Sequence, residues 1–173
     1  MLRHFPLLAC LMPLMACGAS EAESVGSLSL QLSDTPSSYE KLDVELASAS
    51  IHDAESDEDH GWVQIPLATA TINVADVQRG KELPLGSTSV PAGNYDRIQI
   101  MVKKASVTSH GQVIPMGLGD APARVEYAFR VAPFDQTEML LDFDARASVV
   151  PSDTGDGSLR LDPHFTVRSE RRK

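Results

Sequence analysis

The sequence predicts an all-β protein, a single antiparallel β-sandwich of about eight strands over residues 27–167. Apolar side chains recur at every second position over many short segments, which is the period of a strand with one buried face. Turn-forming residues separate these segments at intervals of about ten residues. A chain of 173 residues is long enough for one domain of this type, and it can bury a core without disulfides.

Each element follows from this alternation and from the turn residues around it. Leu residues at positions 28, 30 and 32 alternate with Ser and Gln, and a turn of Asp, Pro and Ser follows. The longest strand begins at the Pro91–Tyr95 turn, and His110-Gly111 is a hairpin signal that joins it to its return strand. The predicted strands are 27–33, 42–51, 62–65, 69–74, 95–108, 113–116, 124–132, 139–143 and 159–167.

Two segments lack the alternation. The 75–85 segment carries helix-forming and turn-forming residues together, so it predicts either one helical turn or a loop. The 145–152 segment is polar and small, and we expect it to be irregular. No internal repeat, coiled coil or low-complexity block occurs, so the sequence predicts one domain followed by a basic C-terminal tail over 168–173.

The charge of the chain excludes one class of function. The chain carries 15 Lys and Arg against 24 Asp and Glu, so its formal net charge is −9. A nucleic-acid-binding domain needs clustered cations that displace the counterions of the phosphates. We therefore expect no nucleic-acid partner, and we expect the protein to be a monomer.

The first residues have the composition of an export signal. A short basic start, Met1 to His4, precedes an apolar run from Phe5 to Ala16, and small residues follow. The run is shorter than the ~20 residues that a helix needs to cross a bilayer, and two Pro residues interrupt it. Residues 1–16 are therefore expected to be a removable leader.

The end of this leader resembles the lipobox of bacterial lipoproteins. Leu14-Met15-Ala16-Cys17 places Leu three residues before a Cys that has small residues on both sides. The resemblance implies that Cys17 is lipidated and begins the mature chain, and that residues 17–26 form the lipidated Cys and a short tether. Two alternatives stay open: a plain secretory signal, and the match Leu7-Leu8-Ala9-Cys10, which only a few apolar residues precede.

The cysteine count agrees with the lipoprotein interpretation. The chain has 2 Cys, at positions 10 and 17, so no disulfide is possible in the body and the fold relies on its core. By the same resemblance, Gly18 in place of Asp after the Cys favours the outer membrane over the inner one. Loss of residues 1–16 removes Arg3 and changes the net charge from −9 to −10. Acyl chains, and not basic residues, would then hold the protein at the membrane.

Several motifs in order resemble a bacterial and archaeal family, the domain of unknown function numbered 4382. The motifs are Gly26-Ser27-Leu28-Ser29-Leu30 with Ser33-Asp34-Thr35-Pro36, Gly61-Trp62-Val63, Pro91-Ala92-Gly93-Asn94-Tyr95 with Ile98, Leu140-Leu141-Asp142-Phe143-Asp144 and Leu161-Asp162-Pro163. The resemblance covers nearly all of 26–167 and implies an exported or lipid-anchored β-sandwich. The Pro-Ala-Gly-x-Tyr turn is also similar to transthyretin-like and carboxypeptidase-regulatory sandwiches. Neither resemblance brings an established activity.

Three carboxylates are candidates for a metal or ligand role. Asp142 and Asp144 are two apart on a predicted strand, so both would lie on one face while Leu141 and Phe143 face the core. Paired carboxylates can bind Ca²⁺, but they can equally accept backbone hydrogen bonds or pair with a cation such as Arg146. Asp34 could take the same role or cap its Pro turn.

The densest charge lies in the 52–60 segment, which has five carboxylates between two His residues. Such a loop can bind Ca²⁺, but the spacing of a calcium-binding loop is missing, and a solvated hairpin loop is the favoured interpretation. The histidines at 52, 60, 110 and 164 lie mainly at predicted loop positions, where we expect them to be solvated.

The sequence contains none of the common catalytic or nucleotide-binding motifs, so we expect no enzyme and no cofactor beyond the Ca²⁺ considered above. Trp62 is the single Trp, and it could form a platform for sugars or fill the core. The sequence predicts a membrane-anchored extracytoplasmic lipoprotein with a binding or structural role in the bacterial envelope and an unidentified protein or glycan partner. The alternative is a Ca²⁺-stabilised adhesin or carbohydrate-binding module.

Overall fold

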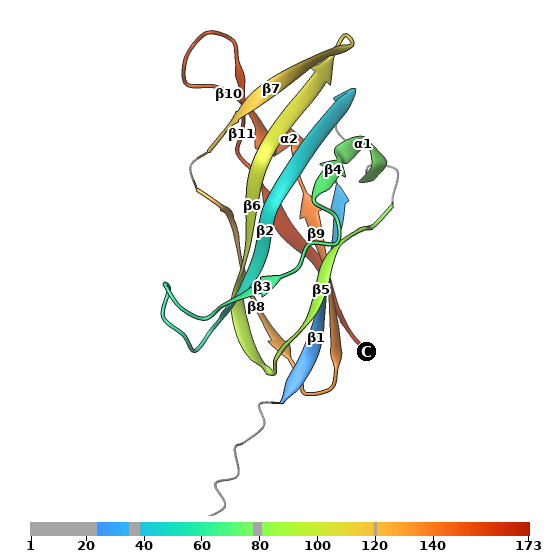
Figure 1. Cartoon of the computed structure of the whole chain (residues 1–173), viewed down its shortest axis with the longest axis vertical. Helices are drawn as coiled ribbons and strands as arrows, with labels where there is room; N and C mark the ends of the chain where they lie inside the picture. Colours follow the sequence, from blue (N-terminus) through green and yellow to red (C-terminus); the bar gives the residue numbers. More distant parts are fainter. Residues whose placement is uncertain (1–23, 35–38, 78–80, 120) are drawn as a thin grey trace, which may run out of the picture.

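The alternating segments form the strands of a two-layered all-β fold, which confirms the predicted fold class (Figure 1). The computed structural model describes residues 24–34, 39–77, 81–119 and 121–173. The leader, Cys17 and the side chain of Asp34 lie outside the described residues. In chain order the elements are β1 (Val25–Asp34), β2 (Lys41–Asp53), β3 (Trp62–Ile65), β4 (Thr71–Asn73), α1 (Val74–Val77), β5 (Leu83–Pro91), β6 (Gly93–Ser109), β7 (Gln112–Leu118), β8 (Ala123–Val131), β9 (Gln136–Phe143), α2 (Ala145–Ser148), β10 (Val149–Pro151), β11 (Leu159–Leu161) and β12 (Phe165–Arg172).

The strands divide into two sheets that lie one behind the other in Figure 1. The smaller sheet has the order β12-β9-β1-β5. The larger sheet has the order β10-β11-β7-β6-β2-β3, with β4 paired to β2 and β8 paired to β6. The prediction of purely antiparallel pairing is wrong, because β1 pairs parallel with β9 and β11 pairs parallel with β7.

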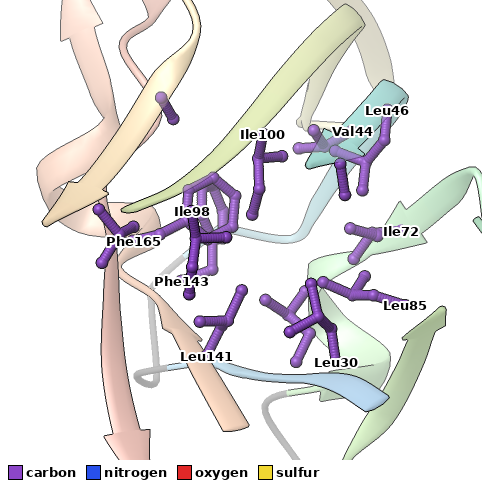
Figure 2. Packing of buried hydrophobic residues seen from close by; sticks show 14 of the residues in the cluster. Leu30, Val44, Leu46, Ile72, Leu85, Ile98, Ile100, Leu141, Phe143 and Phe165 are labelled. Carbon is purple, nitrogen blue, oxygen red and sulfur yellow. The ribbon is translucent and has the colours of Figure 1, made fainter. Parts of the chain in front are cut away.

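The core lies between the two sheets and is built from the predicted apolar positions. Figure 2 shows Leu30 and Leu141 of the smaller sheet on the opposite side of the core from Ile98 and Ile100 of the larger one. Each of these four side chains is fully buried. Leu141 and Phe143 face the core as predicted. Burial of a side chain of this size stabilises the fold by about 1.5–3 kcal/mol, so the alternation predicts where most of the stabilisation arises.

Three segments differ from the sequence prediction. The 145–152 segment is not irregular: it forms the short helix α2 and the strand β10. The 75–85 segment begins with the expected helical turn, α1, and its last residues begin β5, a strand that the sequence did not predict. β12 extends through Arg172, so most of the segment predicted as a basic tail belongs to the smaller sheet. Strands interrupted by Pro, Gly and Ser lack the alternation on which the predictions rest.

The two ends of the sandwich are formed by different turns. We call the end where β1 begins, β5 turns into β6 and β8 turns into β9 the N-terminal pole. The hairpin between β6 and β7 lies at the other end of the molecule, at the top of Figure 1. Neither described helix has the length and apolar character that a membrane span requires.

Candidate functional site

A row of polar and aromatic side chains crosses the outer face of the larger sheet, where β3 and β6 pair with the last residues of β2. His52 of β2 lies opposite Trp62 of β3 on one side and opposite Arg97 of β6 on the other. Ile51 points into the core, so the next residue, His52, points outward from the sheet. The strand register shifts beside Asp96, and this bulge keeps both Asp96 and Arg97 out of the core.

His52 is fully buried although it faces away from the core, because the loop between β2 and β3 folds back over it. Its Nε2 donates to the carbonyl oxygen of Asp57 in that loop, at 3.0 Å. Its Nδ1 lies 2.8 Å from Oδ1 of Asp96 and 3.1 Å from Nη2 of Arg97. Both ring nitrogens are therefore engaged, and the expectation that His52 is a solvated loop residue is wrong.

The surroundings of His52 favour its charged form. Burial by itself lowers the pKa of this imidazole, but hydrogen bonds to the Asp57 carbonyl and to the Asp96 carboxylate outweigh it, so the pKa is raised. Burial raises the pKa of Asp96, but the hydrogen bonds from His52 and Arg97 dominate and lower it. The two shifts have opposite directions, as expected for an imidazolium paired with a carboxylate.

Ion pairs and ring contacts complete the cluster. The Arg97 guanidinium lies 5.9 Å from the centre of the Trp62 ring, within range of a cation–π contact. The Trp62 and His52 rings lie 4.9 Å apart, and the indole Nε1 donates to the carbonyl of Glu58. The Glu58 carboxylate pairs with Arg124 at 3.1 Å and with Arg97 at 3.5 Å. Trp62 thus holds the loop to the sheet, and its indole N–H already has a hydrogen-bond partner.

A cleft of about 280 Å³ lies between this loop and the Pro91–Tyr95 turn. Asp53, Glu55 and Asn94 supply polar groups to its lining, and Val63 and Tyr95 supply apolar surface. The Asp53 carboxylate already accepts hydrogen bonds from the Glu55 amide and the Ser56 hydroxyl. The cleft can therefore accept hydroxyl or cationic groups of a ligand mainly through Glu55 and Asn94, which are exposed.

The structure gives the predicted pair, Asp142 and Asp144, different surroundings. Asp142 is on β9, where its Oδ1 accepts from the Ser33 hydroxyl at 2.9 Å and lies 3.6 Å from Nη1 of Arg168. The prediction that Asp144 is on the same strand face is wrong, because β9 ends at Phe143. Asp144 instead caps helix α2, and its Oδ1 accepts from the amides of Arg146 and Ala147 at 3.0 and 2.9 Å.

The cap gives a testable expectation for Asp144. Asp144→Ala removes both acceptor bonds at the start of α2 and should lower the free energy of unfolding by about 0.5–2 kcal/mol. Asp144→Asn keeps an acceptor oxygen and should lose much less. The measurement is denaturant unfolding of both variants. If Asn were as damaging as Ala, the charge of Asp144 and not its hydrogen bonds would be what matters.

No group of three or more metal-ligating side chains occurs among the residues that the structure describes. The Ca²⁺ hypothesis for Asp34, Asp142 and Asp144 stays a prediction. Sequence reasoning also missed two features. The pairing of His52 with Asp96 depends on a strand register that the sequence does not reveal. Phe134, in a turn, is the most exposed large apolar residue of the described chain.

These observations define a sandwich-like all-β domain whose loop-covered outer face carries a tightly paired polar cluster beside a cleft. The model of one protein family, described as "Domain of unknown function (DUF4382)", matches residues 25–163. The chain belongs to this family, as its motifs suggested. No curated protein and no solved structure matches the chain.

Proposed function

We propose that the protein is a membrane-anchored extracytoplasmic lipoprotein with a non-catalytic binding or structural role in the bacterial envelope. The observation that carries this proposal is the apolar leader that ends in Leu14-Met15-Ala16-Cys17. The position of β1 supports it, since this strand begins at Val25 and leaves only a short tether after Cys17. The outer membrane is the proposed location, because Gly18 follows the Cys.

The geometry of the His52 cluster supports a non-catalytic role. A general base must bring a free nitrogen or oxygen within hydrogen-bond reach of the substrate. The imidazole of His52 is buried, and both its nitrogens already have partners in the protein. We infer that the cluster fixes the loop between β2 and β3 and so shapes the cleft beside it.

The dimensions of the cleft favour a surface ligand over an enclosed one. Pockets for small molecules usually have volumes of ≈ 300–1,000 Å³, and the cleft, at about 280 Å³, is open and smaller. A cleft of this kind accepts one side chain of a protein or one sugar of a glycan. We propose a protein or glycan partner, which a glycan array and a pull-down on the soluble body, Ser20 to Lys173, would identify.

The anchor is tested by metabolic labelling in a bacterial host. Labelled palmitate should enter the wild-type protein, and Cys17→Ala should abolish the incorporation and release the protein from the membrane fraction. Cys10→Ala is the matched control and should be labelled like the wild type. Unlabelled wild-type protein, or equal labelling of Cys17→Ala, would overturn the proposal. Separation of the two membranes by density should place the labelled protein in the outer one.

A further inference from the structure

The N-terminal pole carries an apolar side chain that the fold does not use. Phe134 lies in the turn between β8 and β9 with 89% of its surface exposed, whereas Phe129, Phe143 and Phe165 are each at most 5% exposed. Val25, at the start of β1, is also exposed. Because the Phe134 amide bonds to Val25, the two residues together place apolar surface at this pole, and contiguous exposed apolar surface marks contacts with a partner or a membrane.

Phe134 is held in place and does not simply trail from a loose loop. Its backbone has a φ of +64°, a left-handed conformation that is rare for a bulky residue and costs free energy. Its amide donates to the carbonyl of Val25 at 2.9 Å. Gly26 permits this close approach, because a Cβ there would collide with the carbonyl oxygen of Ala132. The turn therefore presents the ring beside the first residue of β1.

The same pole is where the proposed anchor joins the domain. Seven residues, 18–24, separate Cys17 from Val25, and a chain of this length spans at most about 25 Å. A lipidated Cys17 would thus keep Phe134 within a short distance of the bilayer. At such a distance the effective concentration of the membrane is high, so even a weak additional contact forms.

Two partly exposed cations near the pole, each paired with a more buried carboxylate, lie where they can reach the phosphates of lipid headgroups. β12 ends beside the start of β9, where Lys173 and Gln136 exchange two backbone hydrogen bonds. Arg172 and Lys173 keep 52% and 63% of their side chains exposed, while their partners Glu170 and Glu138 are only 15% and 16% exposed. The cations therefore face outward and cover the acids. Asp135 is the exposed carboxylate next to Phe134.

We propose that the N-terminal pole rests on the bilayer that holds the lipid anchor, with the Phe134 ring inserted at the interface and Arg172 and Lys173 at the phosphates. This inference rests on the proposed lipidation of Cys17. It adds a fixed orientation, because two points of attachment would hold the sandwich upright with the hairpin between β6 and β7 farthest from the membrane.

The test uses the lipidated full chain in vesicles of phosphatidylcholine and phosphatidylglycerol. Trp62→Phe removes the single Trp, and Phe134→Trp then reports on the pole. Val113→Trp is the matched control, because Val113 is 69% exposed and lies next to the hairpin at the other end. Lipids brominated near the headgroup should quench the Trp at 134 several-fold more than the Trp at 113, and should shift its emission to the blue.

Mass spectrometry of the same sample shows whether Cys17 is lipidated, so it tests the proposed anchor separately from the contact between the N-terminal pole and the bilayer. An unmodified Cys17 would overturn the proposed function and this inference with it. A lipidated protein with equal quenching at both positions overturns the inference alone and would favour a protein partner for Phe134. If Trp62→Phe fails to fold, nitroxide labels at Phe134→Cys and Val113→Cys give the same comparison, since the body has no Cys of its own. Equal exposure of both labels to water would then contradict the inference.

Discussion

Phe143→Ala is expected to lower the free energy of unfolding by about 3–5 kcal/mol, the largest loss of any variant considered. Phe143 closes β9 with 2% of its surface exposed, and its ring lies 5.0 Å from that of Phe165 on the neighbouring β12. Removal of the ring loses its burial and leaves a cavity between the two sheets, which the surrounding strands can fill only in part. Denaturant unfolding monitored by circular dichroism measures the loss.

Phe134→Ala is the matched control for Phe143→Ala. It removes the same ring from a position that is 89% exposed, so the stability should change by no more than about 0.5 kcal/mol. The slope of unfolding against denaturant should stay the same in both variants, because the fold itself is kept. A large loss from Phe134→Ala would mean that its ring packs on the domain, contrary to its exposure.

His52→Leu is expected to be the second most damaging change, with a loss of about 2–4 kcal/mol. Leu has a similar size but cannot replace the hydrogen bonds that His52 makes to the Asp57 carbonyl and the Asp96 carboxylate. The Asp57 carbonyl and the Asp96 carboxylate would each lose the hydrogen bond to the buried His52 ring. The loop between β2 and β3 would then be held less firmly against the sheet. His60→Leu, an exposed His of the same loop, should have little effect.

The effect of His52→Leu should also depend on pH. The folded protein raises the pKa of His52, so the protonated form stabilises the fold. That contribution is fully present below the unfolded pKa of about 6.5 and is lost as the pH rises through the higher folded pKa. The difference in melting temperature between wild type and His52→Leu should therefore be larger near pH 5.5 than near pH 8.5.

The other charged groups near His52 do not reverse the direction of this pH dependence. The pKa of Asp96 is lowered, so its contribution is lost only as the pH falls below about 4, outside the tested range. Arg97 stays charged throughout. A stability difference that is constant from about pH 5.5 to pH 8.5 would contradict the charged pair of His52 and Asp96, even if the loss of stability itself were observed.

The sequence predicted the fold class because burial in a strand repeats every two residues. The alternation around Leu30 of the smaller sheet and around Ile98 of the larger one located the core in both sheets, and both side chains are buried as expected. The same period arises in parallel and antiparallel strands, so the parallel pairing of β1 with β9 was invisible. Strand β5 was missed since Pro84 and Gly86 interrupt its pattern.

The candidate site was less predictable than the fold. Trp62 was named as a possible platform or core residue, and its neighbours in the structure come from two other strands, β2 and β6, and from the loop before it. His52 and Asp96 are far apart in the sequence and meet only because of the register of β2 and β6 and the bulge beside Asp96. Asp144 directly follows β9, and counting it as a strand residue together with Asp142 hid its role as the cap of helix α2.

The place of β1 in the smaller sheet determines how the domain would resist a mechanical pull. β1 is flanked on both sides, by β5 and β9, and the proposed anchor is attached at its first residue. A force that pulled the start of β1 away from the opposite end of the sandwich would act along β1, so all its hydrogen bonds to both neighbours would bear the load together. A strand at the edge, peeled from one end, would give way one bond at a time. If Cys17 is lipidated, this placement of β1 would protect the fold against such a pull.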